Sequence, residues 1–183
     1  MAEALNVEFY DRDLIEAAAK KMNMSLSIAS DLEESARPNR FWRMCFPLGH
    51  DESRKQDELF QVEKKIILDL ADAKSCIIVG RCSDSILKCS KHLLRIFIYA
   101  PYKERLKNCV ERLKMDERTA KEMIRNVDRA RDAYQVRYAG YLPGDFHYTD
   151  LLINSSFLGV EATAQYLTEL VLKKYGSHHI EEV

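Results

Sequence analysis

The stretch Cys76-Ile77-Ile78-Val79-Gly80-Arg81-Cys82-Ser83-Asp84 decides the fold that we expect for this chain. Its apolar run, rich in β-branched residues, is typical of a strand buried on both faces of a parallel sheet. Gly80 permits a sharp exit from this strand, and Arg81 and Asp84 follow at once. Because ligands bind outside the carboxyl ends of strands in open α/β sheets, we expect chemistry at this turn. The competing interpretation is an ordinary buried strand, followed by a turn whose charges are solvated.

The rest of the chain alternates strand patterns with helix patterns, which predicts an α/β fold with a parallel sheet. We expect strands around residues 8, 78, 96 and 152. The clearest helix is expected over residues 52–73, with Glu63 at the margin of its apolar face. A long charged helix, capped by Asp116, is expected over residues 117–138. Residues 1–176 are predicted to form a single domain, followed by a flexible tail over 177–183.

Composition and charge narrow the classes of partner. The net charge is −1, so no overall basic field attracts nucleic acid or an anionic membrane. No apolar run reaches the ~18 residues that a membrane helix needs. The first residues lack the basic region and apolar block of a signal peptide. We therefore expect neither nucleic acid nor a membrane as a partner.

The five cysteines indicate a reducing compartment. Their number is odd and no Cys-x-x-Cys occurs, which argues against a disulfide framework and against a zinc site. We therefore predict a cytoplasmic protein without a metal bound by these residues. Cys82, beside Arg81, is either a reactive thiol or a structural one, and the structural interpretation is favoured.

Two arginine-rich segments invite a functional interpretation. Residues 37–43 interleave three arginines with Phe41 and Trp42, which suits a nucleotide, although a loop anchored by buried aromatics is favoured. In the long charged helix, Arg118, Arg125 and Arg129 share one face, because spacings of seven and eleven return to the same side. The pattern of alternating charge by itself favours a solvated, ion-paired face there.

Several motifs occur along the chain in a fixed order, and their order carries a resemblance. They are Ala2–Leu5 with Phe9-Tyr10-Asp11-Arg12-Asp13-Leu14-Ile15, then Ile77–Asp84, Phe97-Ile98-Tyr99-Ala100-Pro101 with Arg105, Val127–Asp132, and Leu151–Ser156. Together they resemble the cytidylate kinase-like family of nucleoside monophosphate kinases and span nearly the whole chain. The resemblance implies a P-loop NTPase fold, with a doubly wound parallel sheet and flanking helices. Residues 24–50 would then be an insertion on the acceptor side, and residues 116–149 a lid-like region.

The resemblance also implies an activity, in which a phosphoryl group moves from ATP, with Mg²⁺, to a nucleoside monophosphate or similar small acceptor. Asp11 matches an aspartate that binds the acceptor, and Arg81 matches the arginine of a Gly-Arg-Asp motif that grips its phosphate. Cys82 stands where that motif has its aspartate, which makes Asp84 a candidate substitute, and Arg12 is a candidate for the role of the phosphate-binding arginine expected near Ala17. In the lid, Arg129 and Arg131 are the catalytic candidates, and Arg137 is a further substrate-binding candidate.

One family element is not in the sequence. The fold's first strand normally leads into Gly-x-x-x-x-Gly-Lys-Ser/Thr, whose backbone and lysine hold the phosphates of ATP, and no such loop occurs. Met1 aligns inside the helix that should follow it, so we expect the first strand and the P-loop to be missing. We then expect weak ATP binding, poor kinase activity of this chain, and association into homo-oligomers through exposed sheet edges.

Three functions remain open on this evidence. The first is an enzyme, a cytidylate kinase-like phosphotransferase whose true start lies upstream. The second is a catalytically inactive regulatory relative that binds a nucleotide or phosphate without the ATP loop. The third is an interaction module that uses Phe41, Trp42 and Phe46 and the long charged helix.

Overall fold

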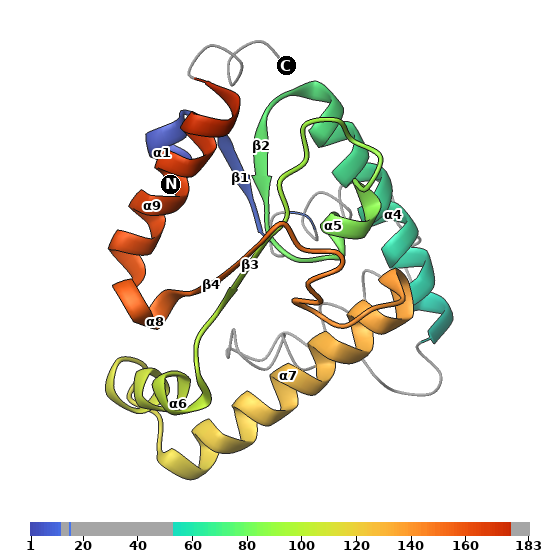
Figure 1. The fold of residues 1–183 in the computed structure, drawn as a ribbon. Coiled ribbons are helices and arrows are strands. Elements are labelled where there is room, and N and C mark those ends of the chain that lie inside the picture. The colour runs from blue at the N-terminus through green and yellow to red at the C-terminus, as the bar shows by residue number, and fades with distance from the viewer. Residues whose placement is uncertain (12–14, 16–52, 177–183) are drawn as a thin grey trace. The chain divides into compact units, whose positions relative to one another are not determined.

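The computed structural model describes residues 1–11, 15 and 53–176 (Figure 1). The chain divides into two compact units. The first unit comprises Met1–Pro38, Gly49–Leu93 and Ala164–Val183, and the second comprises Asn39–Leu48 and Leu94–Thr163. Arg12, the predicted insertion over 24–50 and the predicted tail over 177–183 lie outside the described residues.

The first unit is built around one pair of parallel strands. Strand β1 (Glu8–Tyr10) pairs with β2 (Cys76–Ile78), so that Glu8 lies opposite Cys76 and Tyr10 lies opposite Ile78. The helices of this unit are α1 (Ala2–Leu5), α4 (Ser53–Ala73), α5 (Ser83–Ile86) and the part of α9 (Val160–Tyr175) from Ala164 onward. The strands lie side by side in Figure 1 and point the same way. Parallel strands of this kind need a long crossover connection between them.

The core of the first unit forms where α4 and α5 pack together against the strands. Its buried residues are Ile15, Ile67 and Leu87, and partly buried side chains surround them, including Tyr10 and Ile78. Helix α4 contributes to this core because its apolar residues recur every three or four positions and so share one face. The core therefore holds α4 beside β1 and β2. This packing fixes the position of the chain segments that follow the two strands.

The second unit contains the other strand pair and a helical hairpin. Strand β3 (Ile96–Tyr99) pairs in parallel with β4 (Leu151–Asn154), with Ile96 opposite Leu151. Its helices are α6 (Tyr102–Glu111), α7 (Glu117–Ala139) and the short α8 (Ser155–Leu158). Asp116 caps α7 as predicted, since its Oδ1 accepts from Thr119 N at 2.9 Å.

Helices α6 and α7 are joined by packing and by charge. Buried Cys109, Ala120 and Ile124 form the apolar contact between them. Beside it, both terminal nitrogens of Arg105 donate to the Asp128 carboxylate, at 2.7 and 2.8 Å. Such two-pronged pairing fixes orientation as well as distance, so it sets the register of one helix on the other.

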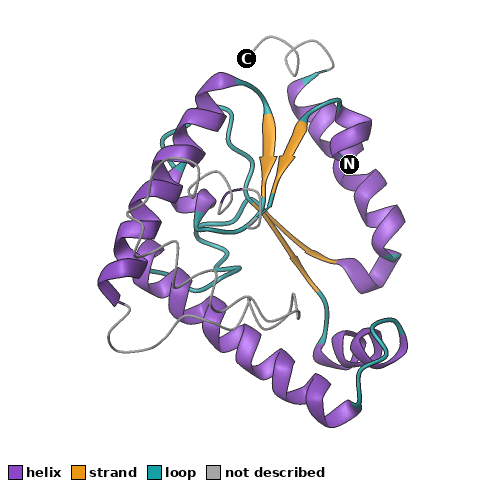
Figure 2. Cartoon of the chain, turned by 180° about the vertical axis from the view of Figure 1, so that it is seen from behind, coloured by secondary structure: helices purple, strands orange, loops and turns teal. Residues whose placement is uncertain are grey.

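The expected strands and their parallel pairing are confirmed, and so is the mixed α/β class. Each unit contains one two-stranded sheet, and the two sheets are seen as two pairs of arrows in Figure 2. The prediction that the strands are buried on both faces is wrong, since the three residues of β2 are only partly buried and Ile98 of β3 is 54% exposed. The reason is that a strand with a single neighbour has less cover than a central strand of a larger parallel sheet. Within the described residues, no helix is long and apolar enough to cross a membrane.

The loop after α7 is held against β3 by a close backbone approach. Gly140 ends α7 with a φ of 85°, and its N–H donates to Val136 O at 3.1 Å. Gly144 has a φ of 75°, and a Cβ added there would lie 2.6 Å from the ring of Phe97. The rings of Tyr141 and Tyr148 stack with their centroids 3.9 Å apart, which closes the loop.

Substituting Gly144 with alanine is therefore expected to destabilise the protein by about 2–5 kcal/mol, since left-handed strain and overpacking add. The matched control is Gly140→Ala, where φ is also positive but nothing lies within 4 Å of the added Cβ. The control should lose only the strain, about 1–2 kcal/mol. Urea unfolding measures both, and equal losses would show that Gly144 is not packed on Phe97.

Candidate functional site

The carboxyl ends of β1 and β2 meet at one edge of the first unit. Beyond the last strand pair, Val79 N donates to Tyr10 O at 2.8 Å. The next residue on one strand is Asp11, and the next on the other are Gly80 and Arg81. The structure thus brings the turn of the opening motif and Asp11 to the same edge, where sequence analysis expected the chemistry.

The turn after β2 is left-handed over three consecutive residues. Gly80, Arg81 and Cys82 have φ values of 78°, 58° and 53°. Ser83 N donates to Gly80 O at 3.1 Å, and Cys82 O then accepts from Ser85 and Ile86 to start α5. The left-handed conformation costs a residue with a Cβ about 1–2 kcal/mol, so Arg81 and Cys82 are held there by their surroundings.

Arg81 is held in this turn by a buried ion pair with Glu63. Arg81 Nε lies 3.2 Å from Oε1 of Glu63, and their side chains are 11% and 1% exposed. The alternative in which Arg81 is a solvated charge is therefore wrong. The sequence pattern puts Glu63 at the margin of the apolar face of α4, whereas the whole residue is buried in the structure.

Cys82 anchors the same turn from inside the protein. Its side chain is 1% exposed. Desolvation, followed by the charge of nearby Asp84, raises the pKa of the Cys82 thiol to about 12. The thiol therefore stays protonated at neutral pH, which supports the structural interpretation over the reactive one.

This burial predicts a difference between two cysteines in the native protein. At pH 8, iodoacetamide should label the exposed Cys89 at least ~10²-fold faster than Cys82, because only thiolates react and a thiol with a pKa near 12 has almost none. In urea, Cys82 should become as reactive as Cys89. Mass spectrometry of tryptic peptides follows both sites, and native labelling at equal rates would exclude a buried Cys82.

The lid candidates lie on α7, in the second unit. Arg129, Arg131 and Arg137 are all exposed along this helix. The Arg137 guanidinium lies 5.5 Å from the centroid of the Tyr138 ring, a cation–π distance. Asp128, their neighbour in sequence, is engaged by Arg105. Arg81 belongs to the other unit, and the lid role of these arginines remains a prediction.

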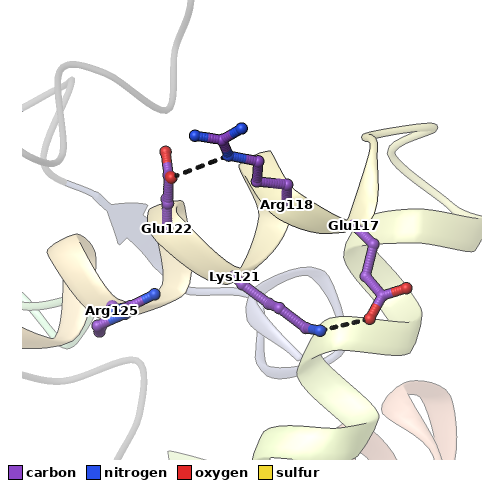
Figure 3. Close-up of a pocket in the computed structure, with 5 residues that line it drawn as sticks. All are labelled: Glu117, Arg118, Lys121, Glu122 and Arg125. Carbon is purple, nitrogen blue, oxygen red and sulfur yellow. Dashed lines mark ion pairs between the residues drawn. The ribbon is translucent and has the colours of Figure 1, made fainter.

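A shallow depression of about 400 Å³ lies on the first half of α7 (Figure 3). Lys121 Nζ lies 2.6 Å from Glu117, and Arg118 lies 3.5 Å from Glu122, both pairs one turn apart. Arg125 completes the lining, and all five residues come from this single helix. The depression is the solvated, ion-paired face that the charge pattern predicted.

Magnesium does not have an evident site in the described part of the chain. Among those residues, no group of three or more His, Cys, Asp or Glu side chains is arranged to hold a metal ion. Asp11 and Asp84 place two carboxylates near the β1–β2 edge, and Mg²⁺ in proteins is usually held by one or two carboxylates together with substrate phosphates and water. The described residues therefore hold no preformed metal cage, and the use of Mg²⁺ stays an implication of the family.

Comparison with known proteins decides the family. A model of the cytidylate kinase-like family matches residues 1–157. The chain belongs to the cytidylate kinase-like family. The matched range contains Asp11, Arg81 and the arginines of α7.

A crystal structure of an uncharacterized protein from Eubacterium ventriosum ATCC 27560 shares the fold of this family member. The two chains have 22% sequence identity and a TM-score of 0.68. The likeness covers 93% of this chain and 86% of the other. No curated protein matches the chain. The structural likeness supports the fold and carries no information about substrate.

Proposed function

We propose that this protein is a phosphotransferase of the nucleoside monophosphate kinase type, which moves a phosphoryl group from ATP to a nucleoside monophosphate or similar small acceptor. The proposal includes the doubly wound P-loop NTPase fold of such kinases. Membership of the cytidylate kinase-like family supports it. The observation that carries it is the edge of β1 and β2, where Asp11 and the Arg81 turn come together.

The chemistry of this edge suits an acceptor with a phosphate. A guanidinium presents planar, forked donors that match phosphate oxygens, and Arg81 is largely withdrawn from water, which strengthens such contacts. Asp11 supplies a carboxylate that accepts hydrogen bonds from the hydroxyl or amino groups of a nucleoside. Asp84, in the first turn of α5, is a second acceptor at the same turn.

The lid residues have a different role in this proposal. Arg129 and Arg131 stabilise negative charge on the migrating phosphoryl group, and Arg137 contributes to substrate binding. ATP and Mg²⁺ are implied by the family. The described residues contain no group of three or more metal-binding side chains, so we assign none of them a part in holding the metal.

The role of Arg81 is tested with Arg81→Lys, which keeps a positive charge beside Glu63 but removes the fork. Calorimetric titration with cytidine monophosphate should show an affinity about 10-fold or more below that of the unaltered chain, as expected for losing a charge-assisted, two-pronged contact. Arg118→Lys is the control, because the Arg118 side chain is 89% exposed and lies on α7. Equal affinities in all three proteins would contradict the assignment of Arg81.

Turnover separates the enzyme from the regulatory alternative. With Mg·ATP and cytidine monophosphate, the enzyme should release ADP, and Arg129→Ala should lower kcat by ~10³-fold or more, as for other arginines at a phosphoryl group. The control is Arg125→Ala, one turn earlier on the same helix. Binding of the monophosphate without any ADP release would instead favour the regulatory relative.

A further inference from the structure

We propose that Glu63 is a positioning residue, which orients the Arg81 guanidinium so that it can bind the phosphate of an acceptor. The inference rests on the proposed function, because it concerns the same anion site. It extends that function to a residue on α4, a helix outside the turn that carries the family motif.

The burial of Glu63 is the first observation. Among the residues that the structure describes, it is the one charged residue that is fully buried. It lies on the same face of α4 as buried Phe60 and Ile67, three residues before it and four after it. A carboxylate in such a place is costly unless a cation compensates it, and Arg81 supplies that cation at 3.2 Å. Glu63 is thus placed to act on Arg81.

The freedom of an arginine side chain is the second part of the argument. The left-handed turn fixes the backbone of Arg81, with a φ of 58°. The long side chain still has many rotamers, whose loss on binding would weaken affinity. An ion pair with a carboxylate from a separate, packed helix limits where the guanidinium can lie before any ligand arrives. Affinity then benefits, because the ordering cost has already been met in folding.

Two other roles for Glu63 predict different effects on phosphate affinity. If the pair only stabilises the fold, changing Glu63 alters stability but leaves the affinity of the folded protein unchanged. If Glu63 competes with the ligand for Arg81, weakening the contact makes phosphate bind more tightly. Positioning alone predicts weaker binding when the contact is lost and the negative charge is kept.

Two variants of Glu63 separate contact from charge. Glu63→Asp keeps the charge but is one methylene shorter, so it withdraws from Nε. Glu63→Gln keeps the length and an acceptor oxygen but loses the charge. The matched control is Glu58→Asp, an exposed position on the same helix. Thermal unfolding shows which variants fold, and calorimetry of the full chain uses inorganic phosphate and cytidine monophosphate as separate probes.

Positioning predicts that Glu63→Asp weakens binding of both probes about 3–10-fold, the range expected for ordering one long side chain. Glu63→Gln and Glu58→Asp should bind both probes with an affinity no more than ~2-fold below that of the unaltered chain. In an Arg81→Lys background, Glu63→Asp should have no further effect, because the two residues act as a unit. Unchanged or tighter binding by Glu63→Asp overturns the proposal.

A measurement on the unaltered chain covers the case in which Glu63→Asp does not fold. The Nε–H resonance of Arg81, assigned by its loss in Arg81→Lys, should exchange slowly with solvent and stay slow while phosphate shifts it. Fast exchange on phosphate binding would mean that the anion displaces Glu63, which overturns the proposal.

The outcomes also separate this inference from the proposed function. If Arg81→Lys weakens binding but Glu63→Asp does not, the acceptor site stands and the positioning role fails. If inorganic phosphate binds as predicted but cytidine monophosphate does not bind, the positioning role stands and the nucleotide acceptor fails. If neither probe binds the unaltered chain, both fail.

Discussion

The buried pair of Glu63 and Arg81 is the interaction on which the candidate site depends. It links the inner face of α4 to the turn after β2, two elements that are otherwise held together by apolar contacts. Without its partner, each charge would be buried alone, which is far more costly than the pair itself. The same contact keeps a cation at the carboxyl end of a parallel strand, where an anionic ligand can approach.

Parallel pairing explains why a few residues far apart in sequence form one edge. Asp11 and Arg81 are seventy positions apart, yet the register of Tyr10 with Ile78 brings the chain segments that carry them together. Cys82 and the left-handed turn then fix where the strand ends and α5 begins. The second unit repeats the scheme with β3 and β4, and adds the helix that carries the lid candidates.

Much of this fold could be predicted from local pattern. The β-branched run before Gly80 indicated β2, and Asp116 with the charged repeat after it indicated the start of α7. Both signals act within a few residues of where they are read. The exposure of Ile98 could not be predicted, because it depends on how many neighbours a strand has in the sheet, which no local pattern records. The burial of Glu63 was missed for a different reason, because a glutamate at the margin of an apolar stripe is ordinarily solvated. The spacing of Phe60, Glu63 and Ile67 was the signal that could have found it.

The central claim is that Arg81 binds the phosphate of a nucleotide acceptor while Glu63 holds it in place. A crystal structure of the full chain with cytidine monophosphate measures this directly. The account predicts phosphate oxygens within hydrogen-bond distance of the Arg81 guanidinium, with Glu63 still in contact at Nε and Asp11 beside the nucleoside. A nucleotide bound away from the β1–β2 edge, or an Arg81 turned away from its phosphate, would contradict the account.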